Sequence, residues 1–520
     1  MKTSSPYYFL LVVILGLVLR LFVALNTGII NSDGAIYIDQ ARIVYYGLWD
    51  VIGAHGERYW SLYPFLIALA YEIAGNWIAA AEAVSIFFGT VTLIPLYFLS
   101  RKFFDERIST LLLLIFAVTP VFVTGSTDVI RDPLYWFLTV TGLCLFTCPA
   151  GSKTHAALAL SGLCFLLATV TRTEAVIFVI IPALHIMLTG ERRIIRLAWF
   201  LLPLIFLFLI AAGAALIYAP ATRVDRIPVH VTSKLASAAA QYHQIRADLR
   251  VLIGAPPANI PATFFDNVRS LVWFIPLGII FQNAMEAFYY PFFLVFIIGL
   301  KETWRKTKTD NNTTLFIALV ISAAMLLYIY ILANWEMEHR WLTLVIIPSF
   351  VFLGSGLEVI IRYLQSRFRM KTASALALVC LAALAFALPK DIKYREEDKI
   401  IFKEIGTSLA RMEGNEREIK VLTAGDSMRW ISFYANLNYR GAPYPDAYYE
   451  YRKIIGKNYD EFRQNLKAEG IQYLVWEERH WPKELFDFVR ERREKDFRTL
   501  GSWRHPDTGE MMLFKVLMNP

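Results

Sequence analysis

Residues 7–25, YYFLLVVILGLVLRLFVAL, form an apolar run that contains a single charged residue, Arg20. A run of about 17 to 25 apolar residues can cross a hydrocarbon core of about 30 Å as one helix. This run is too long for a removed signal peptide and has no small-residue cleavage site, so we expect a membrane anchor. Arg20 lies near the outer end of the run, where its side chain is expected to extend to the membrane surface.

Similar runs recur along most of the chain. Of its 520 residues 56% are hydrophobic, and the mean hydropathy is +0.45, which excludes a soluble globular protein. We predict a polytopic α-helical membrane protein with eleven spans, at residues 7–25, 77–100, 108–125, 133–150, 156–171, 175–190, 197–218, 285–300, 313–333, 341–361 and 372–388. Two shorter apolar stretches, residues 63–73 and 271–281, are expected to be re-entrant or interfacial.

The distribution of Lys and Arg gives the orientation, because basic loops stay on the cytoplasmic side. With the N-terminus inside, the inner loops hold Arg101, Lys102, Arg107, Lys153, Arg192, Arg193, Arg196, Lys301, Arg305, Lys306, Lys308, Arg362, Arg367, Arg369 and Lys371. The short outer loops after the third, fifth and ninth spans hold only Arg131, Arg172 and Arg340. We therefore expect a bacterial or archaeal cytoplasmic membrane protein with its N-terminus inside and its C-terminus outside.

The net charge of +8 arises mostly from these inner loops. Because it is spread over five loops, it indicates contact with anionic membrane lipids and no nucleic-acid partner. The four cysteines, Cys144, Cys148, Cys164 and Cys380, lie in or beside predicted spans, so no disulfide framework is expected in the outer parts.

From about Pro389 the composition becomes that of a soluble domain. Residues 421–423 and 471–476 read as strands, a charged helix precedes Gly470, residues 483–493 read as a helix, and 504–515 as a hairpin turning at 507–509. This predicts two domains: a catalytic membrane domain over residues 1–388, with outer loops at 26–62 and 219–269, and an extracytoplasmic soluble α/β domain over 389–520.

Asp33 is the most informative single residue. It follows the first span by eight residues and precedes a segment in which Tyr37, Ala41, Val44 and Leu48 would share one helix face. A carboxylate held at the membrane surface by such an interfacial helix suits chemistry on a lipid-borne substrate. Alternatively, Asp33 is the N-cap of that helix, and the two roles are compatible.

Further polar residues lie at the predicted outer ends of the spans: Asp128, Arg131 and Asp132; Arg172 and Glu174; His339 and Arg340; and His55, Glu57 and Arg58 in the first outer loop. Ionisable residues at membrane depth usually face a cavity or a partner, so their location indicates a reaction centre at the outer interface. Each also has a structural explanation. Arg172 and Glu174 can pair at a helix end, Arg340 can anchor at the interface, and Asp132 before Pro133 is a good helix start.

The chain resembles the GT-C superfamily of membrane glycosyltransferases, in particular the family-39-like enzymes that include protein O-mannosyltransferases and the aminoarabinose transferase. The resemblance covers the membrane region and rests on Asp33 after the first span and on four short motifs, 58-RYWSLYPFL-66, 132-DPLY-135, 171-TRTE-174 and 339-HRW-341. The C-terminal stretch 471-IQYLV-475 looks like the soluble tail of bacterial members.

This resemblance implies transfer of a sugar from a polyprenyl-phosphate donor to a lipid, glycan or protein acceptor at the outer face of the membrane. Asp33 would act as general base, taking the proton of the attacking hydroxyl. Arg340, Arg131 and Arg172 would bind the donor phosphate, with Asp132, Asp128, Glu57 and Glu174 as supporting acids.

One departure from the family pattern leaves open whether the protein uses a metal ion. Many relatives carry a second acid beside the first-loop aspartate, whereas this chain has 32-SDG-34. Either the partner acid lies elsewhere, at Asp39, Glu57, Asp128 or Asp132, or no divalent cation is used; metal candidates are Asp33, Glu57, Asp132, His55 and His243. Two other functions stay open, a lipid-linked oligosaccharide ligase or transferase and a polytopic transporter, although no internal repeat or mid-span charge favours transport.

Overall fold

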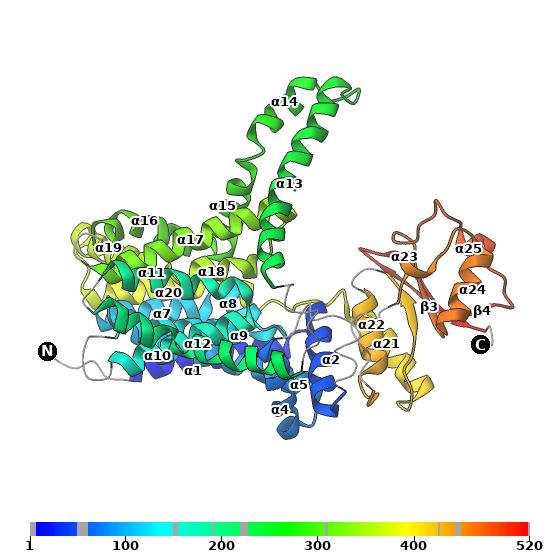
Figure 1. Cartoon of the computed structure of the whole chain (residues 1–520), viewed down its shortest axis with the longest axis horizontal. Coiled ribbons are helices and arrows are strands. Elements are labelled where there is room, and N and C mark those ends of the chain that lie inside the picture. The colour runs from blue at the N-terminus through cyan, green and yellow to red at the C-terminus, as the bar shows by residue number, and fades with distance from the viewer. Residues whose placement is uncertain are drawn as a thin grey trace. The chain divides into compact units, whose positions relative to one another are not determined.

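The computed structural model describes residues 7–48, 61–148, 154–189, 192–218, 227–306, 310–424, 427–441 and 449–517. These residues are mostly helical, with one small sheet near the C-terminus (Figure 1). They form two compact units. Unit 1 comprises Met1–Leu21, Ile86–Ser126 and Arg131–Ile392, and unit 2 comprises Phe22–Ser85, Thr127–Ile130 and Lys393–Pro520.

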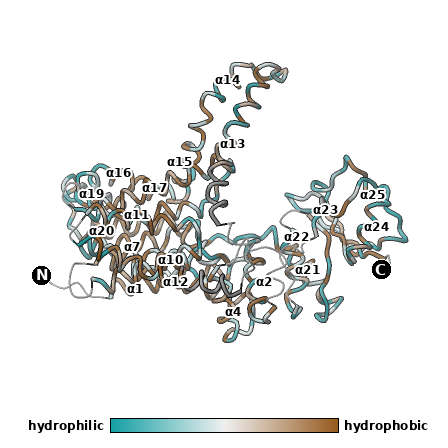
Figure 2. The backbone as a smooth tube through the Cα atoms, in the orientation of Figure 1, coloured by the Kyte–Doolittle hydropathy of each residue, from teal (hydrophilic) through white to brown (hydrophobic). Residues whose placement is uncertain are grey.

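Unit 1 is a bundle of apolar helices, along which hydrophobic positions dominate (Figure 2). Two of its helices, α1 (Tyr7–Leu25) and α5 (Trp77–Val91), extend several residues into unit 2, and α8 (Pro120–Thr127) ends there with its last residue, Thr127. The others are α6 (Leu93–Ser100), α7 (Glu106–Val118), α9 (Asp132–Phe146), α10 (Thr154–Thr171), η1 (Thr173–Val176), α11 (Ile177–Leu188), α12 (Arg193–Tyr218), α13 (Ile227–Gly254), α14 (Ala262–Leu271), α15 (Ile275–Ala287), α16 (Tyr290–Lys306), α17 (Asn311–Asn334), η3 (His339–Leu342), α18 (Thr343–Ile346), α19 (Phe350–Phe368) and α20 (Thr372–Asp391).

Five helical segments in the described parts are long and apolar enough to cross a membrane: Tyr7–Leu25, Trp77–Ser100, Thr154–Thr171, Asn311–Asn334 and Thr372–Asp391. Three bent helix pairs raise this number to eight if each is one span. The bend of 52° between α7 and α8 falls at Thr119, whose extended backbone precedes Pro120 and interrupts the helix. A multi-pass membrane protein is thus confirmed, while the number eleven stays a prediction.

Arg20 does not reach toward the surface, so that prediction was wrong. Its side chain is 1% exposed and donates to the carbonyl oxygens of Gly16 at 2.9 Å and Ala117 at 3.2 Å. The first bond lies within α1 and the second joins α1 to α7, and both are made by Nη1, which the apolar bundle would otherwise leave unpaired. The predicted outer region 219–269 contains α13 and α14, which pack against each other (Figure 1).

Unit 2 contains α2 (Ser32–Tyr46), α4 (Leu62–Ala74), the start of α5, α21 (Ile400–Glu413), α22 (Ser427–Asn436), α23 (Tyr451–Ile454), α24 (Tyr459–Glu469) and α25 (Phe488–Glu491). The helix predicted after Asp33 is present, but it is not amphipathic. Residues Gly34 to Ile43 are all buried, because α4 and α22 pack against α2.

The sheet of unit 2 has the strand order β2-β1-β3-β5-β4. Its strands are β1 (Val421–Thr423), β2 (Tyr449–Glu450), β3 (Tyr473–Glu477), β4 (Phe497–His505) and β5 (Gly509–Val516). β1 runs parallel to β2 and β3, and β5 runs antiparallel to β3 and β4. Phe462, Trp481, Phe488 and Phe514 are central to the core beside it.

The soluble α/β module is therefore confirmed, with one local error. α24 ends at Glu469, and Gly470 caps it with a φ of 64°, a left-handed conformation that glycine adopts easily because it has no Cβ. The predicted helix over 483–493 is reduced to α25, because Trp481 and Phe486 turn into the aromatic core and the intervening residues form turns.

Candidate active site

Asp33 is the second residue of α2 and does not cap it. Asn31 occupies the N-cap position. Its φ of −64° and ψ of 156° are extended, and the helix begins at the next residue. The Asn31 side chain binds a different segment: its Oδ1 accepts from the Val129 N–H at 2.8 Å, and its Nδ2 donates to the Val129 carbonyl at 3.4 Å. The alternative that Asp33 is the N-cap was wrong, although a carboxylate in the first turn is still favoured by the helix dipole.

Gly34 explains why no second acid stands beside Asp33. A Cβ at this position would lie 2.9 Å from the Cβ of Val129 and 3.0 Å from Oδ1 of Asn31. A side chain would thus push the Val129 segment away from the start of α2. That same segment supplies Asp128, so the chain places an acid near Asp33 from another loop.

Each of these two acids faces an arginine from the C-terminal part of the chain. Nη1 of Arg429, on α22, lies 3.3 Å from Oδ1 of Asp33, and both side chains are 30% exposed. Nη2 of Arg395 lies 3.0 Å from Oδ1 of Asp128, and its Nη1 donates to the Thr127 hydroxyl at 3.2 Å. Neither arginine was predicted from the sequence, since no local pattern links residues so distant in the chain.

Backbone bonds fix these segments of unit 2 together. The Gly28 N–H donates to the Arg395 carbonyl at 3.1 Å, and the Arg395 N–H donates to the Asn26 carbonyl at 3.3 Å. The indole of Trp430, next to Arg429, donates to the Ile30 carbonyl at 2.7 Å. The loop before α2, the Asp128 segment and α22 are therefore held as one arrangement.

Asp39 has a different role from Asp33 on the same helix. Its carboxylate lies 3.0 Å from Nη1 of Arg42, and both side chains are fully buried. Nη2 of Arg42 also donates to the carbonyls of Asn436, at 3.1 Å, and Tyr439. This pair joins α2 to the end of α22, and its burial makes it a structural element rather than a group open to substrate.

The polar residues predicted on unit 1 form a separate cluster. Arg172 pairs with Asp132 and lies 3.4 Å from Glu174, and its guanidinium carbon is 4.6 Å from the Trp341 ring centroid. The side chains of Arg172 and Asp132 are only 6% and 3% exposed. The structure thus brings these predicted site residues together. The Arg172–Glu174 contact agrees with the alternative that these two residues pair at a helix end.

Arg340 and Arg131 are less enclosed. Nε and Nη2 of Arg340 bind the Glu338 carboxylate at 2.6 and 3.0 Å, and the Arg340 side chain is 26% exposed. Arg131 is half-buried at the N-cap of α9. His243 is exposed on α13. The predicted residues His55, Glu57 and Arg58 lie outside the described residues.

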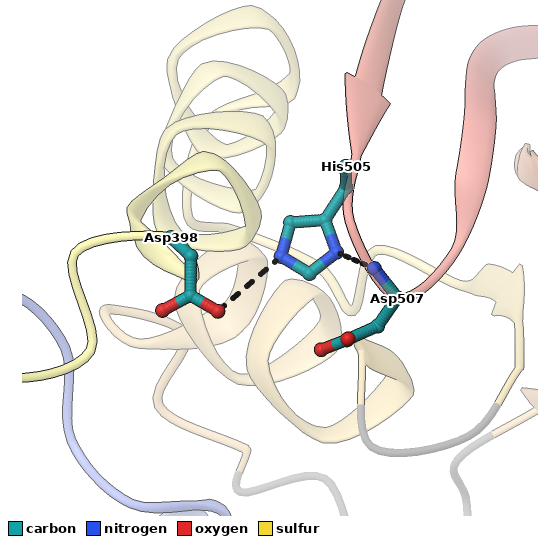
Figure 3. A group of neighbouring side chains, drawn as sticks. All are labelled: Asp398, His505 and Asp507. Carbon is teal, nitrogen blue, oxygen red and sulfur yellow. Dashed lines mark hydrogen bonds and ion pairs between the residues drawn. The ribbon is translucent and has the colours of Figure 1, made fainter.

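In the described part of the chain, one group of side chains could bind a metal ion. It comprises Asp398, His505 and Asp507, whose potential ligand atoms lie within 4.8 Å of one another (Figure 3). His505 is 4% exposed, and its Nε2 lies 3.9 Å from Asp398. Its Nδ1 accepts the Asp507 backbone N–H at 3.2 Å, so the neutral ring carries its proton on Nε2. While this hydrogen bond is kept, the Nδ1 lone pair is used by the amide and the protonated Nε2 cannot coordinate, so a metal ion would have to displace the Asp507 N–H from Nδ1 or the proton from Nε2.

Of the predicted metal residues that the structure describes, Asp33 and Asp132 each face a guanidinium, which repels a cation where the carboxylate would bind it. His55 and Glu57 lie outside the described residues, so the use of a divalent cation stays a prediction.

Comparison with known proteins agrees with this fold. Residues 61–218, less than half of the chain, match the family model described as Dolichyl-phosphate-mannose-protein mannosyltransferase. ArnT from Cupriavidus metallidurans bound to undecaprenyl phosphate superposes with a TM-score of 0.58 and 10% identity, covering 99% of this chain and 100% of ArnT. The chain has the fold of the GT-C glycosyltransferases.

Two other similar structures are of the oligosaccharyltransferase AglB from Archaeoglobus fulgidus. The complex with an inhibitory peptide and a dolichol-phosphate has a TM-score of 0.56 and 12% identity, covering 97% of this chain and 74% of AglB. The complex with Zn and sulfate has a TM-score of 0.58 and 14% identity, covering 97% and 72%. No curated protein matches the sequence. The resemblance stated from the sequence motifs is thus confirmed at the level of the fold.

Proposed function

We propose that the protein transfers a sugar from a polyprenyl-phosphate donor to a hydroxyl acceptor, with Asp33 as general base. The observation that carries this proposal is the partly exposed Asp33 in the first turn of α2, next to the segment that supplies Asp128, in a chain with the GT-C fold. Two of the similar structures named above are complexes with undecaprenyl phosphate and dolichol-phosphate, which supports a polyprenyl-phosphate carrier.

The chemistry follows from a poor nucleophile and an anionic leaving group. An acceptor hydroxyl attacks the anomeric carbon as Asp33 takes its proton, and the bond from that carbon to the phosphate oxygen breaks. The electron pair leaves with the polyprenyl phosphate, which gains one negative charge that a cationic group must stabilise. Asp128 is the supporting acid that the geometry favours, since Asp132 is enclosed with Arg172.

For the donor phosphate, Arg340 and Arg131 are better candidates than Arg172, whose guanidinium is buried between carboxylates and Trp341. We place the reaction at the outer face of the cytoplasmic membrane, as the basic inner loops predict. Residues 1–388 would form the membrane domain and 389–520 an extracytoplasmic domain. The AglB likeness keeps a lipid-linked oligosaccharide as an alternative donor.

The test is the Asp33→Asn variant, assayed for transfer from polyprenyl-phosphate-linked sugars in detergent. Asn keeps the size and a hydrogen-bonding oxygen for Arg429 but cannot take a proton, so we expect a loss of about 10² to 10⁴-fold in turnover. Asp105→Asn is the matched control, because Asp105 is the N-cap of α7 and accepts the Ile108 N–H. Near-normal turnover of Asp33→Asn would move the base elsewhere and refute its assignment.

A further inference from the structure

Arg429, on α22 of unit 2, is a partly exposed arginine that contacts the proposed catalytic base. Within the described residues its guanidinium makes one hydrogen bond, the 3.3 Å contact to Asp33, although a guanidinium has five N–H donors. Arg42, by contrast, is fully buried with Asp39 and two carbonyl oxygens, and it cannot change partners without leaving charges uncompensated.

The Asp33–Arg429 pair is weak enough to exchange. Both side chains are 30% exposed, and an ion pair with this exposure changes an equilibrium by at most about five-fold. A guanidinium–phosphate contact, which is charge-assisted and bidentate, is stronger, about 10- to 100-fold. A phosphate that enters beside Asp33 would therefore displace the carboxylate from Arg429.

The charges of the proposed reaction match such an exchange. Asp33 must be free of a strong partner to accept the proton of the hydroxyl, and the leaving phosphate needs a cation as its charge grows. One guanidinium can meet both needs in turn, since in the described structure it already binds an anion at this position.

We propose that Arg429 binds the phosphate of the polyprenyl donor and releases Asp33 as it does so. This inference rests on the proposed function and adds a substrate-binding residue from the C-terminal region. Donor binding would thereby break the contact between Arg429 and the Asp33 carboxylate. The assignment of Arg429 does not depend on the one proposed for Arg340.

The experiment measures binding of undecaprenyl phosphate to the full-length protein in detergent, with undecaprenol and inorganic phosphate as separate probes. Arg429→Gln should bind undecaprenyl phosphate about 10- to 100-fold more weakly, and Arg429→Lys should fall between it and the wild type. Asp33→Asn should bind it about two- to five-fold more tightly, because the competing carboxylate charge is gone. Undecaprenol binding should be unchanged in all three variants.

Arg417→Gln is the matched control, since Arg417 forms a partly exposed pair with Glu413 elsewhere in unit 2. Equal affinity of Arg429→Gln and the wild type would overturn the inference while leaving the proposed function intact. Weaker binding in both Arg429→Gln and Asp33→Asn would also overturn it, because the pair would then act only by holding α2 and α22 in place. Inorganic phosphate binding as tightly as the lipid would overturn the lipid donor as the ligand. A wild type that neither binds the lipid phosphate nor transfers sugar would refute the proposed function itself.

Discussion

Asp39→Asn is the change that separates the structural acid of α2 from the proposed catalytic one. It leaves the Arg42 guanidinium buried without its counter-charge, although Asn keeps a hydrogen-bond acceptor. Removing one partner of a fully buried ion pair costs about 3 to 5 kcal/mol. For a unit of about 200 residues, 1 kcal/mol lowers the melting temperature by about 2 to 4 °C, so we expect a decrease of roughly 6 to 20 °C.

The same substitution at Asp33 should cost far less, because an ion pair between two side chains that are each 30% exposed contributes at most about 1 kcal/mol. Thermal unfolding of both variants in detergent, followed by tryptophan fluorescence, provides the comparison. Hydrogen exchange should show that the loss of protection in Asp39→Asn begins in α2 and in residues 436–439, which Arg42 joins. If Asp39→Asn melts within about 2 °C of the wild type, the assignment of this pair as a structural element is wrong.

Two further outcomes follow from single side chains. Arg340→Lys keeps the charge but loses the planar fork, so the donor KM should rise about 10-fold while the protein stays folded; an unchanged KM would make Arg340 an interfacial anchor. Hydrogen bonds from Tyr473, Lys515 and Arg417 lower the pKa of Glu413 to about 2. A lowered pKa stabilises the fold above the pKa of the unfolded chain, about 4.3, and this stability is lost as the pH falls toward 2. Between these pH values, the free energy of unfolding of Glu413→Gln should therefore fall less steeply with decreasing pH than that of the wild type. An equal pH dependence in the two proteins would contradict this.

Much of the fold was predictable because its signals are local. Long apolar runs mark the helices of unit 1, and Gly470 and the turn at 507–509 mark a helix end and a hairpin. The span count is harder, because bends such as the one at Thr119 divide an apolar run into two shorter helices.

The errors arise where distant segments change the environment of a residue. The α2 segment reads as an amphipathic helix, but α4 and α22 pack against it and residues Gly34 to Ile43 are all buried. Arg20 reads as an anchor, but the Ala117 carbonyl lies within reach of it. Asp128 was one of four candidates for the second acid, and the sequence does not show that its segment lies against the start of α2, where Gly34 and Val129 approach closely.

The distance in sequence between Asp33 and Arg429 also has a consequence for biosynthesis. These residues are 396 positions apart, so at about 5 to 20 residues per second the ribosome makes Arg429 roughly 20 to 80 s after Asp33. During this time α2 lacks the backbone carbonyls of Asn436 and Tyr439 that later accept from Arg42. The nascent α2 therefore lacks these partners for its charged residues until the later segment is made. A chain whose synthesis stops before α22 cannot form the Asp33–Arg429 pair.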